Sequence, residues 1–168
     1  MFIRNWKLFL ESYPNSLGEL NDMIDSIMDM LVELVDDGWF VRVDYTPKRF
    51  ESEVNGILSD YIGVMIKRKK SGIVSRYSVD SFFNWSDVED YVCRIRDSYP
   101  NKDICYEVII PSGNSYSGYG VIVGDFKSVT FDELVDLGNS GVLLGIFLEI
   151  YLGGVNVDGF NYGDVVSY

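Results

Sequence analysis

The most constraining feature of this chain is an amphipathic segment at residues 17–37. Its apolar residues recur at steps of three and four, which is the period of an α-helix with one buried face. These residues are Leu20, Met23, Ile24, Ile27, Met28, Leu31, Leu34 and Val35. Ser16 and Glu19 have the spacing of a capping box, and Gly38 stands where a left-handed C-terminal cap belongs. Because such a helix must bury its apolar face, the sequence predicts that it packs on another layer of secondary structure.

Two segments that follow this helix predict β-strands. Residues 39–45 and 61–68 alternate between apolar and polar side chains, which is the two-residue period of a half-buried strand. The side chains expected on the buried face are Trp39, Val41, Val43, Tyr45, Ile62, Val64 and Ile66. A polar tip at residues 70–72 predicts a hairpin that leads to a further strand near residues 73–79.

Two further helices are predicted from capping boxes in the second half of the chain. A Ser-x-x-Glu pattern at residues 86–89 would open the first of these helices, which ends before Pro100. A Thr-x-x-Glu pattern at residues 130–133 would open the second, a short helix over residues 131–137 that stops at Gly138.

Three more segments are candidates for strands. Residues 104–110 and 119–123 are rich in β-branched and aromatic side chains, and residues 111–115 between them are rich in turn formers. Residues 142–152 fit either a strand or a buried helix, because a continuous apolar run has no decisive period. We favour the strand.

These elements predict a single α+β domain. A length of 168 residues fits one domain, and 47% apolar residues can bury a core of ordinary size. The economical arrangement is a mainly antiparallel sheet with about three helices packed on one face, formed by residues 1–152. Residues 153–168 are rich in glycine and aromatic residues, and we expect them to dock on the domain or on a partner. Cys93 and Cys105 are expected to be buried free thiols.

The chain contains no histidine, alanine or glutamine. Histidine is the usual general base and a common metal ligand, so its absence excludes catalytic triads and zinc or haem sites that depend on it. The three missing residue types are encoded only by codons that contain cytosine. This usage predicts a cytosine-poor coding strand, as in many bacteriophage genomes, with an AT-rich bacterium as the alternative.

The net charge of −12 is unevenly distributed. Residues 15–38 carry seven carboxylates and residues 128–168 carry six, with no Lys or Arg in either block. Direct binding of nucleic acid is therefore not expected, because phosphate contacts need clustered Lys and Arg. The longest apolar run is too short to span a bilayer, and the apolar residues at 1–14 are interrupted, so neither secretion nor membrane insertion is expected. The expected location is the bacterial cytoplasm or a virion.

A row of carboxylates follows the helical spacing opposite the apolar face of the first helix. It consists of Asp22, Asp25, Asp29, Glu33 and Asp36. Like charges at these separations destabilise a helix by roughly 0.2–0.5 kcal/mol per pair, and no Lys or Arg on this helix compensates them. The row is either a solvated helix face or a surface that docks a basic partner.

Other candidate contact residues lie at a hairpin tip, in a loop and in the tail. The basic patch consists of Lys67, Arg68, Lys69 and Lys70. This patch either keeps a sheet edge soluble or binds an acidic partner, such as the acidic helix of a neighbouring copy. The aromatic contact residues are Tyr116, Tyr119, Phe160 and Tyr162. Tyrosine supplies large contact area at low entropic cost.

The sequence contains no recognisable catalytic constellation. Asp103 and Glu107 fall on one expected strand, but Ile109 stands where a metal-dependent nuclease has a lysine, and no paired acid can be identified. Cys93 has no base within reach along the sequence, and the tail lacks two carboxylates that a calcium loop requires. We therefore expect a protein that is not an enzyme and that uses no cofactor and no metal.

The favoured hypothesis is a protein-interaction protein, encoded by a phage and acting as a virion component or accessory subunit. Its partner would be a basic protein or another copy of the chain. The alternative is an acidic mimic of nucleic acid that inhibits a host nuclease or polymerase.

Overall fold

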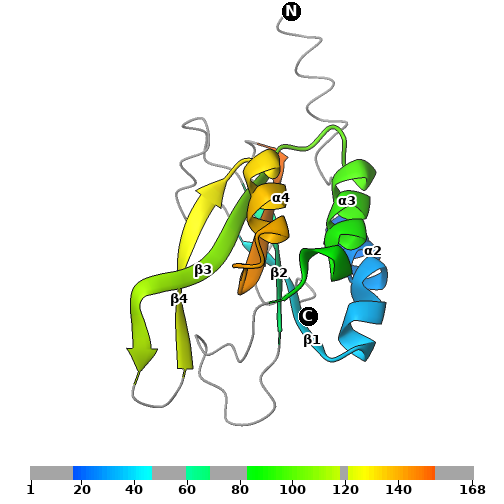
Figure 1. The fold of residues 1–168 in the computed structure, drawn as a ribbon. Coiled ribbons are helices and arrows are strands. Elements are labelled where there is room, and N and C mark those ends of the chain that lie inside the picture. Colours follow the sequence, from blue (N-terminus) through cyan, green and yellow to red (C-terminus); the bar gives the residue numbers. More distant parts are fainter. Residues whose placement is uncertain (1–16, 47–59, 69–82, 118–120, 154–168) are drawn as a thin grey trace, which may run out of the picture.

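The computed structural model describes residues 17–46, 60–68, 83–117 and 121–153 (Figure 1). In chain order the elements are α2 (Leu17–Asp36), β1 (Trp39–Thr46), β2 (Asp60–Arg68), the 3-10 turn η2 (Trp85–Asp87), α3 (Glu89–Ser98), β3 (Ile104–Ser117), β4 (Val121–Val129), α4 (Phe131–Asn139) and β5 (Gly145–Gly153). The α+β fold class is confirmed. None of the described helices is long and apolar enough to cross a membrane.

The last strand, β5, lies in the middle of the sheet. The strands follow the order β1-β2-β5-β3-β4, and every neighbouring pair is antiparallel. Of the two structures that residues 142–152 allowed, the strand is the one formed. Because β5 pairs with β2 on one side and with β3 on the other, both halves of the chain contribute to one continuous sheet (Figure 1).

One face of the sheet shares a single hydrophobic core with the three described α-helices. The sheet residues in this core include Trp39, Val43, Tyr45, Ile62, Val64, Ile66, Tyr106, Val108, Ile146, Leu148 and Ile150. The helix residues include Leu20, Ile24, Ile27, Leu31, Leu34, Val92, Ile95 and Leu134. Since successive residues of a strand point to opposite faces, these sheet residues all lie on one face. The alternation predicted for residues 39–45 and 61–68 is therefore confirmed.

Helix α2 agrees closely with its predicted position. It spans Leu17–Asp36, and Gly38 has a φ of 85°, the left-handed conformation expected of a C-terminal cap. One expectation for its apolar face is wrong, because Val35 is 38% exposed. Ser16, the predicted N-cap, lies outside the described residues.

The two later capping boxes have different outcomes. Thr130 Oγ1 accepts a hydrogen bond from Glu133 N at 3.2 Å, and Thr130 N donates to Glu133 Oε2 at 3.0 Å, so this capping box is confirmed. The box at Ser86 is wrong, because α3 begins at Glu89 and its N-cap residue, Val88, makes no side-chain cap. Residues 85–87 instead form a 3-10 turn that buries Trp85, so the packing of one large side chain overrides the local capping signal.

Three expected boundaries are also wrong. Helix α4 continues to Asn139 instead of stopping before Gly138, which is buried inside the helix. The turn-forming residues 111–115 belong to β3, where the pairing with β4 has a register shift between Pro111 and Tyr116. Strand β4 extends to Val129, well beyond the predicted end. The turn-forming residues 112–115 therefore make an irregularity within β3, between two paired parts of the β3–β4 hairpin, and do not form the turn that ends it. The strand predicted near residues 73–79 lies outside the described residues.

Candidate interaction surface

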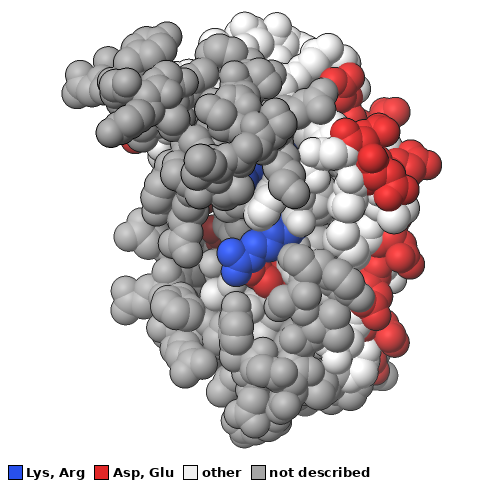
Figure 2. Space-filling view, turned by 90° about the horizontal axis from the view of Figure 1, so that it is seen from below, with Lys and Arg blue, Asp and Glu red and all other residues white. Residues whose placement is uncertain are grey.

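The outer face of α2 carries the predicted row of carboxylates. Asp22, Asp29, Glu33 and Asp36 are exposed, and Asp25 is half-buried. Asp22, Asp29 and Asp36 follow one another at steps of seven residues, which is nearly two full helical turns. They therefore lie almost in line along α2. Figure 2 shows acidic residues gathered in a row down the side of the molecule on which α2 lies in Figure 1. We call these five residues the acidic stripe.

Three carboxylates of the acidic stripe form no ion pair with a described residue. In the described part of the chain, no Lys or Arg forms an ion pair with Asp22, Asp29 or Asp36. These three carboxylates therefore present negative charge to an approaching partner.

Glu33 differs from these three because it contacts α3. Tyr91 Oη donates a hydrogen bond to Glu33 Oε2 at 2.8 Å. This bond to a carboxylate raises the pKa of the Tyr91 hydroxyl. The guanidinium of Arg94 lies 5.3 Å from the centre of the Tyr91 ring, within the range of a cation–π contact. Glu33 thus helps to hold α2 against α3.

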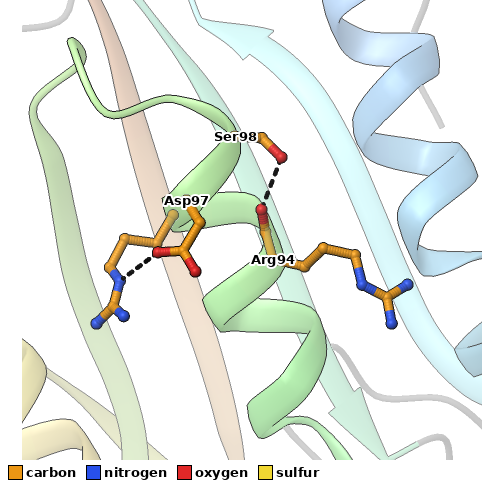
Figure 3. A network of polar contacts seen from close by, with 4 residues as sticks. Arg94, Asp97 and Ser98 are labelled. Carbon is orange, nitrogen blue, oxygen red and sulfur yellow. Dashed lines mark hydrogen bonds and ion pairs between the residues drawn. The ribbon is translucent and has the colours of Figure 1, made fainter.

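The charged side chains of α3 point in different directions. The Arg94 side chain extends away from Asp97 (Figure 3). Arg96 Nε lies 3.4 Å from Asp97 Oδ1, and the Arg96 guanidinium lies 4.1 Å from the centre of the Phe131 ring in α4. Ser98 Oγ donates to the Arg94 carbonyl at 2.7 Å. Arg96 is therefore directed towards α4 and not towards the acidic stripe.

Val32 adjoins the acidic stripe, and Val35 is the neighbour of Val32 one turn further along the flank of α2. Val32 is 48% exposed and Val35 is 38% exposed. Val32 follows Asp29 by three residues and precedes Asp36 by four, so all three are neighbours on the helix surface. The outer face of α2 therefore combines apolar contact area with negative charge. The sequence did not reveal this, because its pattern placed Val35 in the core and gave no role to Val32.

The other predicted contact residues are only partly described. Lys67 lies with its Nζ 4.7 Å from the centre of the Phe40 ring, and Arg68 ends β2 opposite Trp39. Tyr116 pairs with Ile122 across the β3–β4 hairpin. The remaining members lie outside the described residues: Lys69, Lys70, Tyr119, Phe160 and Tyr162. The basic patch and the aromatic contact residues thus stay predictions.

The sheet face opposite the hydrophobic core brings two glutamates together. Glu149 in β5 stands opposite Cys105 in β3, and Glu107 stands opposite Phe147, so Glu107 and Glu149 are diagonal neighbours. Burial raises the pKa of the Glu107 carboxyl, and the charge of Glu149 raises it further. Tyr151 Oη donates a hydrogen bond to Glu149 Oε2. Glu149 is the paired acid that the sequence did not reveal, because nothing local to either residue indicates that β5 pairs with β3.

This pair of glutamates offers limited chemistry. Among the described residues no group of three or more acidic or cysteine side chains could hold a metal ion. Asp103, the other acid considered beside Glu107, is exposed. Cys93 and Cys105 are free, as predicted, but half-buried instead of buried. Burial raises the pKa of both thiols, which keeps them in the less reactive protonated form.

The acidic stripe is thus a surface on which exposure, negative charge and apolar area coincide. No protein-family model, no curated protein and no solved structure matches this chain.

Proposed function

We propose that this chain is a non-enzymatic interaction protein that docks a basic partner protein on the outer face of α2. The supporting observation is the alignment of exposed Val32 with three exposed carboxylates that form no ion pair with a described residue, on a helix that also exposes Val35 at the flank of this face. The carboxylates steer a basic partner to this face, and the valines provide contact area that excludes water.

We further propose that the protein is a bacteriophage virion component or an accessory subunit. The support for this part is the absence of alanine, histidine and glutamine, which a cytosine-poor coding strand explains. The cytosine content of the gene tests the coding-strand premise directly.

Imitation of duplex DNA is the second candidate, and the charge density of the stripe counts against it. The five carboxylates span residues 22–36, or about 21 Å at 1.5 Å per residue, which gives about one charge per 4–5 Å. Duplex DNA carries one charge per about 1.7 Å. The stripe has about a third of that density, and exposed valines have no counterpart in a row of phosphates. Docking of a basic protein therefore fits the surface better than mimicry.

The first experiment is to identify the partner by chemical cross-linking in the native source. The purified partner is then titrated with wild-type protein and with the triple variant Asp22→Asn, Asp29→Asn, Asp36→Asn. At about 0.5 kcal/mol for each exposed charge contact, three lost contacts weaken binding by roughly tenfold. The variant should fold normally, because removing like charges relieves repulsion along α2.

The matched control removes the same amount of charge elsewhere. Asp87, Asp103 and Asp136 are all exposed and lie outside α2 and β4, so their replacement by Asn should leave binding close to wild type. Equal losses in the two triple variants would mean that only net charge matters, and unchanged binding in the α2 variant would exclude the stripe as the docking surface. Competition between the chain and DNA for the same partner would instead favour the nucleic-acid mimic.

A further inference from the structure

Strand β4 forms one edge of the sheet. It pairs with β3 and, as the last strand in the order β1-β2-β5-β3-β4, with no other described strand. Asp125, Phe126, Lys127 and Ser128 are consecutive and all exposed, with Phe126 at 51%. An edge strand with an exposed aromatic residue is a template for pairing with another strand.

The direction of the backbone groups in β3 follows from two hydrogen bonds. The Ile109 carbonyl accepts from Leu144 N at 2.8 Å, and the Asp103 carbonyl accepts from Tyr151 N at 2.9 Å. Tyr151 belongs to β5, and Leu144 directly precedes it. The odd-numbered residues of β3 therefore direct their backbone N–H and C=O groups towards β5. Because this direction alternates along a strand, the even-numbered residues direct theirs towards β4.

The same alternation identifies the backbone N–H and C=O groups of β4 that face away from β3. Val108 is opposite Lys127 and Ile110 is opposite Asp125, so these two β4 residues use their backbone groups to bind β3. Phe126 lies between them and therefore directs its N–H and C=O away from the sheet. Its flanking positions two residues away, Gly124 and Ser128, do the same.

We propose that two copies of this chain associate by antiparallel pairing of their β4 strands about a two-fold axis at Phe126. In this register the two Phe126 residues exchange a pair of backbone hydrogen bonds, and Gly124 of each copy pairs with Ser128 of the other. Asp125 then stands directly opposite Lys127 of the second copy, and Lys127 opposite its Asp125. Both charged pairs occupy the closer, non-hydrogen-bonded type of position, where side chains interact most strongly.

The charges favour this register over its neighbours. A two-fold axis at Asp125 would place the two Asp125 carboxylates opposite each other, and an axis at Lys127 would do the same for the two ammonium groups. Like charges directly opposite destabilise a sheet. The register centred on Phe126 converts both pairs into attractions, and it covers the exposed Phe126 ring with its counterpart.

This association goes beyond the proposed docking of a basic partner and uses a different part of the molecule. Helix α2 packs mainly on β1, which is the opposite end of the sheet from β4. An interface of one strand pair is small, so the dimer should form in a concentration-dependent equilibrium and not as a permanent complex.

Sedimentation velocity tests the proposal with the full chain and two charge variants. Wild-type protein should show reversible dimerisation between low micromolar and near-millimolar concentration. In Asp125→Lys all four facing groups are basic, and in Lys127→Asp all four are acidic, so each variant alone should dimerise at least about tenfold more weakly. Mixing the two variants pairs Lys with Asp at both positions, so a heterodimer with wild-type-like affinity should form.

The mixing experiment separates the β4 contact from damage to the fold, because two misfolded variants would not rescue each other. Asp136→Lys, which makes the same charge change at an exposed position of α4, is the control and should dimerise as wild type does. A wild-type protein that stays monomeric throughout the concentration range overturns the proposal. Single variants that dimerise normally, or a mixture that fails to associate, overturn it as well.

Discussion

Gly138 is the position where packing and helix propensity make opposite predictions. It lies inside α4 and is buried against Trp85, which is 1% exposed. A Cβ at Gly138 would lie 2.5 Å from Trp85 Cγ, 2.7 Å from its Cβ and 2.8 Å from its Cδ2. These distances are far below van der Waals contact. The three Trp85 atoms lie close to the backbone of a fully buried residue, so the side chain cannot rotate away.

The expected effect of Gly138→Ala follows from two opposing free energies. Alanine is favoured over glycine in a helix interior by about 1 kcal/mol. Overpacking a core typically costs about 1–3 kcal/mol, and three clashing atoms of a buried indole place this site at about the upper value. The net loss is therefore about 2 kcal/mol. For a protein of this size it corresponds to a Tm lower by roughly 4–8 °C.

Urea unfolding followed by far-ultraviolet circular dichroism measures this loss without relying on the fluorescence of Trp85. Gly18→Ala is the control, because Gly18 is exposed in the first turn of α2 and the change should be neutral or slightly stabilising. A Gly138→Ala protein that is as stable as wild type, or more stable, would refute the claim that the close approach of α4 to Trp85 requires glycine.

Two further variants test the cap of α4 and the half-buried Glu107. Thr130→Ala removes the hydroxyl that accepts from Glu133 N, so the free energy of unfolding should fall by about 1 kcal/mol in thermal or urea unfolding, whereas Thr130→Ser should retain most of the stability. The pKa of Glu107 is raised in the folded state, so the folded protein binds more protons than the unfolded chain. Stability is therefore lost as the pH rises from the ordinary carboxyl pKa of 4.5 through the raised pKa of the folded state. Glu107→Gln cannot ionise, so its urea midpoint should match wild type in acid and exceed it at neutral pH; an equal difference at both pH values would contradict this sign.

The elements that sequence reasoning predicted well are those with strong local signals. The period of three and four in α2 and the alternation in β1 arise within one segment, so they are readable without knowledge of the rest of the chain. The Thr130–Glu133 cap is also local, and it is formed as expected.

The predictions that failed depend on contacts between distant segments. Ser86 has the spacing of a capping residue, but burial of the neighbouring Trp85 determines the local backbone instead. Gly138 is a residue type that commonly ends a helix, but here its lack of a side chain leaves room for the side chain of Trp85. The proximity of Glu107 and Glu149 follows from the insertion of β5 between β2 and β3, which no local pattern encodes.

The two proposed surfaces have a joint consequence because they lie at opposite ends of the sheet. Pairing at β4 leaves α2 uncovered in both copies, so a dimer would present two acidic stripes related by a two-fold axis. A partner with repeated basic sites could then bind both stripes at once, and the second contact would form at the high effective concentration set by the first. Weak pairing at β4 would in this way add most to binding when the partner is a repetitive assembly, and little when it is a single basic protein.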